Sequence, residues 1–372
     1  MTAIAGCDVL VVGAGIVGLA HAAEAVDRGL SVVVIDRDAR AVGASVRNFG
    51  HACVTAQSGE LLDLAHVARE RWLAQSRDAA FFAIESGALA VAQSPAELAV
   101  LDELSASREA GEVQLLTAAE LRSRYSDVAG EAVIGGALLR DDLRVDPREA
   151  VGAIAAGLAA RGVRFLWRTA YLGASAGVAD TSRGSITAQR VIVCVGHDLD
   201  YLYPQLAEAH EVQRCGLQMA RVRAASPVQL RPAVLTGTSM LRYPAFTGTE
   251  AAGALLEEIA AGDPELIDIA ANVMFTQRPD GTIIAGDSHS YDLTMAPFLA
   301  ESTWDVLLER IRRVLGVERL EVVERWQGVY ASSPQHPYLV AEPEPGVTAV
   351  SITSGVGMTI SFGVAASVFA SF

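Results

Sequence analysis

The chain has 372 residues, of which 51% are hydrophobic and 20% charged, so it is long enough for two domains and too apolar to be disordered. Its 44 acidic and 29 basic residues give a net charge of −15, which argues against a nucleic-acid partner because phosphate binding needs a basic surface. All 29 basic residues are arginine, and the lack of lysine excludes Schiff-base chemistry, P-loop phosphate binding and a lysine base.

The four cysteines are widely spaced and form no Cys-x-x-Cys pair, and the seven histidines are scattered along the chain. This spacing predicts neither a metal site nor a disulfide framework. We therefore expect a cytoplasmic protein in a reducing environment.

The first thirty-six residues alternate strand, glycine turn, helix and strand. Val9–Val12 is a short apolar run, Gly13–Gly18 follows as Gly-Ala-Gly-Ile-Val-Gly, and an alanine-rich amphipathic stretch continues to about Arg28. A second β-branched run, Ser31–Ile35, ends at Asp36. This order is that of a βαβ unit that binds a dinucleotide, and the glycine motif alone would be a weak signal.

Each part of this unit has a physical role in holding a dinucleotide. Gly13 allows the tight turn, Gly15 lets the backbone approach a pyrophosphate, and Gly18 lets the helix pack closely on the strand. The helix N-terminus supplies free N–H groups and a partial positive charge for the phosphates. Asp36 can accept hydrogen bonds from a ribose hydroxyl, which disfavours NADP and leaves NAD and FAD open. The alternative is a purely structural βαβ turn.

The middle of the chain predicts a ligand-facing loop, several helices and a buried strand. Gly43–His51 carries small and amide residues, with Ser45 and Asn48 as candidate donors, and an ordinary connecting loop is the alternative. Helices are predicted at about 61–86, 94–125 and 146–161. Arg190–Val193 is a buried strand leading to Gly196, where the backbone can approach the same dinucleotide a second time.

From residue 213 onward the pattern changes to short β-branched segments. Strands are predicted at 215–222, 234–242, 272–277, 282–285 and 321–330, with a helical insertion at 253–271. Arg278–Gly281 is a turn that joins two of these strands into a hairpin. The pattern predicts an antiparallel sheet and hence a second domain.

The tail from Pro345 to Phe372 carries no charge and resembles a membrane span in composition. It contains Ser354–Met358, a glycine turn that would lie in mid-membrane, and it divides into a strand, Val347–Thr353, and a helix, Thr359–Phe369. We therefore expect it to be buried inside a soluble sheet, without a transmembrane segment.

Taken in order, these segments resemble the FAD-dependent D-amino-acid oxidase/glycine oxidase (DAO) superfamily along nearly the whole chain. The matching pieces are Gly13–Gly18 with Asp36, Ser45–Gly50, the strand that ends at Gly196, and the loop Gly355–Thr359. The resemblance implies an α/β fold in which a Rossmann-like FAD/NAD(P)-binding domain is interrupted by an inserted α+β substrate domain with an antiparallel sheet. It implies an FAD-binding domain at 1–80, 141–212 and 331–372, and a substrate-binding domain at 81–140 and 213–330.

The resemblance also implies non-covalent FAD between the two domains. The Gly355–Thr359 loop would contact the pyrimidine edge of the flavin, and the backbone near Tyr171 would meet the adenine. None of the four cysteines lies in this C-terminal loop. The expected cofactor-binding residues are Gly13, Ala14, Gly15, Ile16, Gly18, Asp36, Arg37, Ser45, Asn48, Phe49, Gly50, Tyr171, Cys194, Gly196, Gly355, Val356, Gly357, Met358 and Thr359.

Four segments are similar to a subgroup of these oxidoreductases that is associated with aminophosphonate breakdown. They are Ser45–Gly50, Leu241–Phe246, Gly286–His289 and Arg325–Tyr330. The subgroup is similar to enzymes that oxidise 2-aminoethylphosphonate or its N-methyl derivative.

One departure from the wider superfamily concerns the substrate anion. Glycine and D-amino-acid oxidases carry Trp-x-Gly-x-Arg-Pro, whose arginine clamps the substrate carboxylate. In the matching run, Trp326–Ala331, the arginine position holds Tyr330. An α-amino carboxylate would lose its main anchor, whereas a tyrosine hydroxyl with another cation could hold a phosphonate.

The expected substrate-binding residues are Tyr330, the cations Arg242 and Arg47, and the supporting donors His51 and His289. Each has a structural alternative. An arginine on a strand is more often a surface or ion-paired residue, and a single histidine is more often structural than catalytic.

The implied reaction transfers a hydride from a carbon–nitrogen bond of a small anionic primary or secondary amine to the flavin, and the imine is then hydrolysed. The substrate reacts as a neutral amine, so a dry pocket and an anion anchor matter more than a base, and no base is assigned. The electron acceptor, oxygen or another, stays open. The rivals are glycine, sarcosine or D-amino-acid oxidation, a flavin-dependent 2-hydroxy-acid dehydrogenase and, last, a non-enzymatic dinucleotide-binding module.

Overall fold

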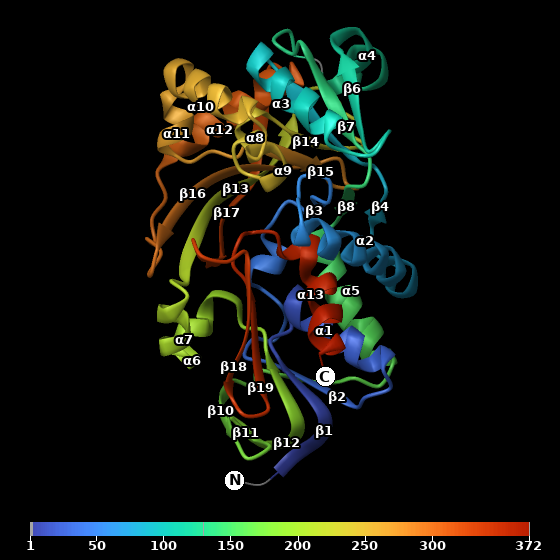
Figure 1. Cartoon of the computed structure of the whole chain (residues 1–372), viewed down its shortest axis with the longest axis vertical. Helices are drawn as coiled ribbons and strands as arrows, with labels where there is room; N and C mark the ends of the chain where they lie inside the picture. The colour runs from blue at the N-terminus through green and yellow to red at the C-terminus, as the bar shows by residue number, and fades with distance from the viewer. Residues whose placement is uncertain (1–2, 129, 372) are drawn as a thin grey trace.

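The computed structural model describes residues 3–128 and 130–371, and its two large sheets lie at opposite ends of an elongated molecule (Figure 1). Residues 1, 2, 129 and 372, which the predicted domain segments include, lie outside the described residues. The first sheet takes its strands from the segments predicted to bind FAD, and the second from those predicted to bind substrate. The domain boundaries themselves stay predictions.

The first sheet has a parallel centre built around the N-terminal strand. Its parallel strands are β1 (Ala3–Val12), β2 (Val32–Asp36), β9 (Arg164–Trp167), β12 (Gly184–Val193) and β19 (Val347–Ile352). Antiparallel pairs add β10 (Tyr171–Ser175), β11 (Val178–Thr181) and β18 (Tyr338–Glu344). The apolar run at residues 9–12 is buried, as expected of a parallel strand that is covered on both faces.

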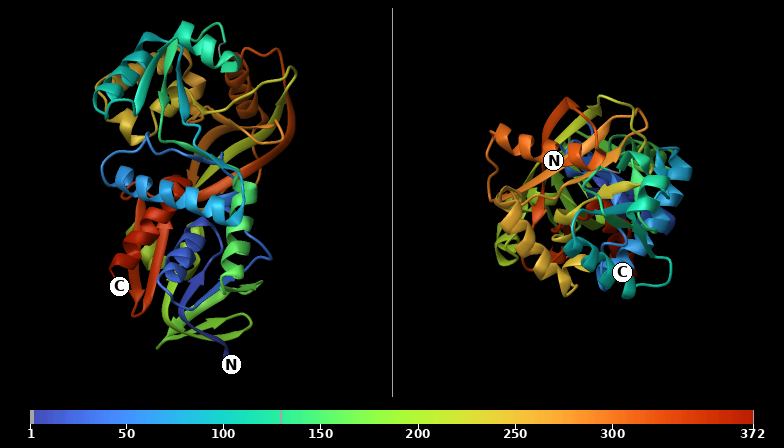
Figure 2. Two further views of the ribbon diagram at one scale, coloured as in Figure 1. Left: turned by 90° about the vertical axis from the view of Figure 1, so that its right-hand side faces the viewer. Right: turned by 90° about the horizontal axis from the view of Figure 1, so that it is seen from above.

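Four helices pack against one another beside the first sheet (Figure 2). They are α1 (Ile16–Asp27), α2 (Glu60–Ala79), α5 (Pro147–Ala160) and α13 (Gly357–Ala370). Trp72 of α2 is fully buried, donates its indole N–H to the carbonyl oxygen of Met358 at 2.7 Å, and packs edge-on against Phe362. The uncharged C-terminal tail is therefore held in the core of this half of the molecule.

The tail differs from its predicted form in one respect. Because α13 begins at Gly357, the predicted loop Gly355–Thr359 is in part the first helical turn. Among the described residues, no helix is long and apolar enough to cross a membrane.

A buried histidine on α1 makes stability depend on pH. His21 is fully buried, its Nδ1 lies 2.7 Å from the carbonyl oxygen of Val17, and its Nε2 has no hydrogen-bond partner among the described residues. Burial lowers the pKa of His21 from 6.5 to about 4. Between these values the unfolded chain binds a proton that the folded chain does not, so stability is lost as the pH falls.

We expect the free energy of unfolding to decrease by roughly 3 kcal/mol more in the wild type than in His21→Leu when the pH falls from 7 to 4. Urea unfolding of both proteins across this range measures the difference. Equal pH dependence in the two proteins would contradict the assignment.

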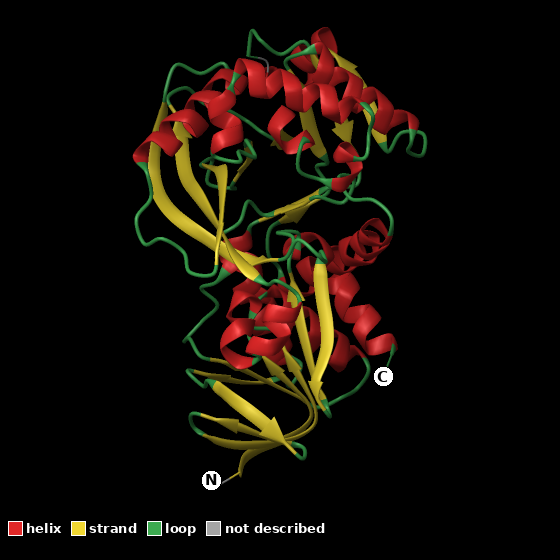
Figure 3. Cartoon of the chain, turned by 60° about the vertical axis from the view of Figure 1, so that its left-hand side comes forward, coloured by secondary structure: helices red, strands yellow, loops and turns green. Residues whose placement is uncertain are grey.

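The second sheet has the order β17-β13-β16-β15-β14-β5-β7-β6. Its strands are β5 (Ala88–Ala92), β6 (Val113–Thr117), β7 (Gly135–Leu139), β13 (Gln213–Ala224), β14 (Ala233–Leu235), β15 (Met274–Gln277), β16 (Ile283–Asp292) and β17 (Leu320–Ser332). All neighbouring pairs are antiparallel except β14 with β5, so the predicted antiparallel sheet contains one parallel pair. Helices lie over it (Figure 3), namely α3 (Pro95–Ala106), α4 (Ala118–Arg124), α10 (Ala251–Gly262), α11 (Pro264–Asp268) and α12 (Glu301–Leu315).

The strand predicted at 234–242 is wrong over most of its length. β14 ends at Leu235, and two short helices follow, α8 (Gly237–Met240) and α9 (Pro244–Thr247). The hydroxyl of Ser239 accepts the backbone N–H of Thr236 at 3.4 Å, and a proline opens α9, so local hydrogen bonding competes with the strand. Arg242 consequently lies in the link between two helices rather than on a strand.

A small sheet lies between the two large ones. It consists of β3 (His51–Ala52), β8 (Leu143–Val145) and β4 (Ala83–Ile84), in antiparallel pairs. The remaining elements are α6 (Leu199–Leu202), α7 (Pro204–Ala209) and the 3₁₀ turns η1 (Ala44–Val46), η2 (Ser126–Val128) and η3 (Gly196–Asp198).

Candidate functional site

The glycine turn after β1 has the close contacts that its motif predicts. Gly13 has a φ of +103°, and a Cβ added there would lie 2.4 Å from the carbonyl oxygen of Cys194. A Cβ at Gly18 would lie 1.9 Å from the carbonyl oxygen of Gly13. Both positions therefore require glycine for close packing, and Gly13 requires it also for its backbone conformation.

The N-terminus of α1 is open for an anionic group. Gly15 is the N-cap residue and contributes no side chain, and the backbone N–H of Ile16 donates to the Ser45 hydroxyl at 2.9 Å. The carboxylate of Asp36 accepts the backbone N–H groups of Ala14 and Asp38, each at 2.8 Å. Burial raises the pKa of Asp36, which still has free lone pairs for a ribose hydroxyl.

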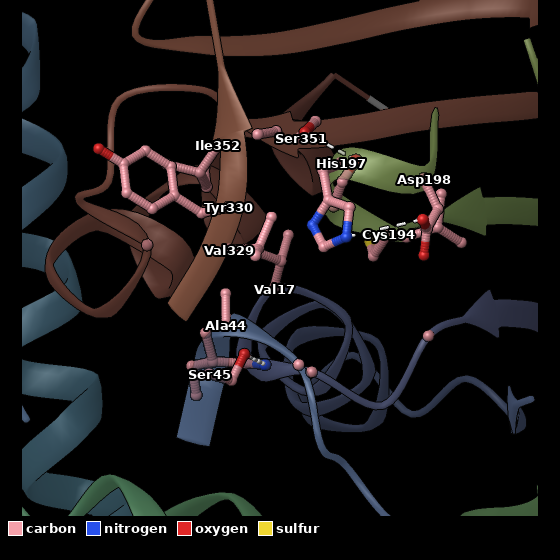
Figure 4. A pocket seen from close by; sticks show the side chains of 18 of the residues that line it. Val17, Ala44, Ser45, Cys194, His197, Asp198, Val329, Tyr330, Ser351 and Ile352 are labelled. Atoms are coloured by element: carbon pink, nitrogen blue, oxygen red, sulfur yellow. Dashed lines mark hydrogen bonds and ion pairs between the residues drawn. The ribbon is translucent and has the colours of Figure 1, made fainter. Parts of the chain in front are cut away.

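A single cavity runs from this glycine turn to the second sheet. Figure 4 shows Val17, Ala44 and Ser45 on one side of it, and Tyr330, Ser351 and Ile352 on the other. The predicted cofactor residues that line it are Gly13, Gly15, Ile16, Asp36, Arg37, Ser45, Asn48, Phe49, Tyr171, Cys194, Gly196, Gly355, Gly357 and Met358. The cavity therefore joins pieces of chain that are far apart in the sequence.

Five predicted cofactor residues do not line the cavity, namely Ala14, Gly18, Gly50, Val356 and Thr359. Their contacts explain this placement. A Cβ at Gly50 would lie 1.9 Å from the carbonyl oxygen of Val145, so Gly50 packs on β8. The hydroxyl of Thr359 accepts the backbone N–H of Cys53 at 3.1 Å. We assign these residues a supporting role behind the lining.

The cavity also holds residues that sequence reasoning missed. In η3, Oδ2 of Asp198 lies 2.6 Å from Nη2 of Arg37. Oδ1 of the same carboxylate lies 3.6 Å from Nε2 of the neighbouring His197 (Figure 4). Burial lowers the pKa of His197. The only sequence signal for the pair was its position directly after Gly196.

The far end of the cavity carries a half-buried cation between two phenols. Arg242 donates from Nη2 to the hydroxyl of Tyr330 at 2.7 Å and from Nη1 to that of Tyr291 at 3.3 Å. Burial raises the pKa of Tyr330 well above its ordinary value, although Arg242 lowers it, so the phenol is neutral. A Cβ at Gly355 would lie 3.0 Å from the Tyr330 ring, which places the predicted flavin-facing loop beside this pair.

Arg47 and His289 also line the cavity, with different surroundings. Arg47 is exposed, donates to the carbonyl oxygen of Gln327 at 3.2 Å, and accepts the indole N–H of Trp326 at 3.1 Å through its own carbonyl oxygen. His289 is buried, and its Nδ1 lies 2.9 Å from the carbonyl oxygen of Ala270. Burial lowers the pKa of His289 well below its ordinary value, so it is neutral.

His51, a predicted substrate-binding residue, is placed away from the cavity lining. Its imidazole is buried in the small sheet, with Nε2 at 2.7 Å from Asp142 Oδ2 and Nδ1 at 3.2 Å from Cys53 Sγ. Asp142 also accepts the backbone N–H of Thr55 at 2.7 Å. These contacts use both ring nitrogens, so His51 has none free for the substrate.

Two further polar residues line the same end of the cavity, Asp287 and Asn272. The motif Gly286–His289 pointed to this segment, but only its histidine was selected from the sequence. Asn272 lies at the start of a predicted strand and carried no signal of its own. The reciprocal backbone hydrogen bonds between Asp287 and Asn272, at 2.9 and 2.8 Å, place their side chains together.

A glycine-lined dinucleotide cradle that shares one cavity with a half-buried cation is the arrangement expected of a dinucleotide-dependent enzyme that acts on an anionic substrate. A family model described as FAD dependent oxidoreductase matches residues 8–370, so the chain belongs to this family. The residues fit FAD, because the turn at Gly13, the open N-terminus of α1 and the acid at Asp36 lie at one end of the cavity, with Gly355 at the other. FAD is therefore the cofactor, as the resemblance implied.

Solved structures share the fold at low sequence identity. Glycine oxidase from Geobacillus kaustophilus has a TM-score of 0.77 and 20% identity, with 98% of this chain and 94% of that chain covered. L-proline dehydrogenase from P. horikoshii has a TM-score of 0.78 and 18% identity, over 97% and 91%. L-α-glycerophosphate oxidase from Mycoplasma pneumoniae has a TM-score of 0.71 and 15% identity, over 99% and 96%. Among curated proteins, none matches this chain.

Proposed function

We propose that this FAD-dependent oxidoreductase oxidises the carbon–nitrogen bond of a small anionic amine, with 2-aminoethylphosphonate or its N-methyl derivative as the preferred substrate. The observation that carries the proposal is the pair formed by Arg242 and Tyr330 inside the cavity. Two solved relatives by fold, glycine oxidase and L-proline dehydrogenase, are named for oxidation of amines. The third, L-α-glycerophosphate oxidase, acts on a different class of substrate and keeps C–O oxidation as the rival.

The pair accounts for the departure at Tyr330 from the superfamily pattern. Arg242, on the link between α8 and α9, supplies a cation next to Tyr330, and the Tyr330 phenol supplies an additional O–H donor. A guanidinium and a hydroxyl approach an anion from different directions, which suits a tetrahedral group with three oxygens better than a planar carboxylate. We therefore assign the phosphonate of the substrate to this pair.

The remaining roles follow from position. The FAD, when bound, supplies the hydride acceptor for the reaction. Arg242 and Tyr330 hold the anion and thereby fix the carbon that carries the amine, while the buried His289 helps to keep water from the reacting end. Arg47 lies at the exposed side and attracts the anion during entry.

We further propose that the FAD is bound without a covalent link and that the protein is cytoplasmic. Cys194 lines the cavity, but burial raises the pKa of its thiol far above the ordinary value, so the reactive thiolate is not formed. All four cysteines are free thiols, which fits a reducing compartment. The electron acceptor is oxygen or another oxidant.

The test is anaerobic bleaching of the bound flavin by a substrate panel. The panel holds 2-aminoethylphosphonate, its N-methyl form, glycine, sarcosine, D-amino acids and 2-hydroxy acids. We expect rapid bleaching by the aminophosphonates and slow bleaching by the others. Bleaching by amino acids or hydroxy acids, with none by aminophosphonates, would replace the proposed substrate by one of those rivals.

A further inference from the structure

A buried carboxylate near the Arg242–Tyr330 pair has no role in the function described so far. Asp287 of β16 lines the cavity, yet the residue is only 2% exposed. Its Oδ1 has no hydrogen-bond partner within the described part of the chain, and neither does Oδ1 of the adjacent Asn272. Two acceptor oxygens are therefore buried together without hydrogen-bond donors. This arrangement costs folding free energy unless a ligand supplies the donors.

The Asn272 side chain and the backbone N–H of Asp287 itself donate toward this carboxylate and lower its pKa, but in the described part of the chain no protein donor pairs with Oδ1. His289 Nδ1 lies 3.9 Å from Asp287 Oδ1, but it contacts the carbonyl oxygen of Ala270 at 2.9 Å, and a carbonyl needs a donor. Since His289 is neutral, its Nδ1–H serves Ala270 and is not free for the carboxylate. The guanidinium of Arg242 donates to two phenols and acts on Asp287 through its charge.

The other titratable groups that face Asp287 are neutral. Cys215 on β13 has its pKa raised to about 11 by burial, and Tyr243 has its pKa raised well above the ordinary value by burial. The pKa of Asp287 itself is raised to about 7, because burial outweighs the charge of Arg242. Near neutral pH the described residues at this end of the cavity therefore include a fixed cation, Arg242, and a carboxylate able to gain or lose a proton, Asp287.

We propose that Asp287 and Asn272 bind the substrate ammonium group, and that Asp287 takes its proton before the carbon–nitrogen bond is oxidised. An ammonium offers the N–H donors that the two free oxygens lack. In this proton transfer one N–H bond of the ammonium breaks and one O–H bond forms on Asp287. The electron pair of the N–H bond stays on nitrogen as the amine lone pair. The proton returns to solvent when the product departs.

This proposal rests on the proposed function and narrows its substrate class. The anion site at Arg242 and the ammonium site at Asp287 together select a small zwitterion. A 2-hydroxy acid would fill the first site but offer only one O–H donor to the second, so at least one of the two oxygens would stay unpaired, which a polar site penalises. The proton transfer is also more favourable than to an ordinary aspartate, because a pKa of about 7 is closer to that of an alkylammonium, about 10.

The decisive variant is Asp287→Asn, with Asp292→Asn as its control. Asp292 lies on the same strand, is exposed and is absent from the cavity lining. For the wild type, kcat/KM for 2-aminoethylphosphonate should rise with pH through about 7, as Asp287 loses its proton. Asp287→Asn should lower kcat/KM at pH 7 by roughly 100- to 10,000-fold, with the deficit shrinking at higher pH as free neutral amine accumulates. Asp292→Asn should match the wild type.

A binding measurement gives a second, independent readout. Calorimetric titration of the anaerobically reduced holoenzyme yields Kd without turnover. The wild type should bind 2-aminoethylphosphonate roughly 10- to 100-fold more tightly than ethylphosphonate, and Asp287→Asn should remove this difference. Flavin content and spectrum of each variant show that the fold is retained.

The outcomes separate this inference from the proposed function. If the wild type oxidises an amine and Asp287→Asn keeps both its kcat/KM and its pH profile, the role of Asp287 is overturned and the proposed function stands. If no amine reduces the wild-type flavin, the proposed function fails and the role of Asp287 fails with it.

Discussion

Replacing Arg242 by glutamine is expected to lower kcat/KM for the anionic amine roughly 30- to 4,000-fold, because removing one partner of a charge pair that the bound substrate would bury costs about 2–5 kcal/mol. The guanidinium is the half-buried cation that contacts Tyr330, and no lysine exists anywhere in the chain to replace it. The anion is held before and during the reaction alike, so most of the loss should appear in KM and less in kcat.

Two further variants separate charge from geometry at this position. Arg242→Lys keeps the charge but lacks the planar, forked guanidinium whose two terminal nitrogens contact Tyr330 and Tyr291, so we expect partial recovery only. Arg325→Gln is the control, because Arg325 lies on the same strand as Tyr330 but is exposed and pairs with Glu301 at 2.5 Å. Steady-state kinetics on the flavin-loaded proteins measure all three. A wild-type KM in Arg242→Gln would show that the anion binds elsewhere.

The cofactor half of the site could be predicted because its signals are local. Gly13, Gly15, Gly18 and Asp36 fall within one βαβ unit, and each acts through the backbone of that unit. The spacing of strand, turn and helix fixes where these residues lie, so little depends on the rest of the chain. Tyr171 and Cys194 needed the family resemblance as well, because their strands join the sheet from far along the sequence.

The substrate half depended on contacts that no local pattern encodes. Arg242 was selected for its charge, yet its predicted strand is a pair of short helices, and hydrogen bonding at Thr236 decides between them. His51 was selected for its residue type, but its position is set by Asp142, 91 residues further on.

Asp287 was passed over for the same reason. Its importance comes from burial and from the lack of a donor, and both are properties of the assembled sheet. Sequence periodicity places residues on a face, but it does not report which polar atoms are left unpaired there.

The largest expected effect on the cofactor comes from Gly13→Ala, which should yield a folded protein that retains little or no FAD. The new methyl group would lie 2.4 Å from the carbonyl oxygen of Cys194, at a φ of +103° that alanine rarely adopts. The turn must shift, and with it the N-terminus of α1 that holds the phosphates. Gly43→Ala is the matched control, because Gly43 also lines the cavity but has open space around its Cβ position and an ordinary φ of −83°.

Flavin absorbance per protein after gel filtration measures the loss, and far-UV circular dichroism reports the fold. Should Gly13→Ala fail to fold, Gly15→Ala provides the same test with less strain. Its methyl group would meet only the Ser45 hydroxyl, at 3.1 Å, and would stand at the N-terminus of α1 where the phosphates bind. Stoichiometric flavin in both glycine variants would mean that the pyrophosphate is held elsewhere, because a cradle that needs bare backbone cannot accept a methyl group at either position.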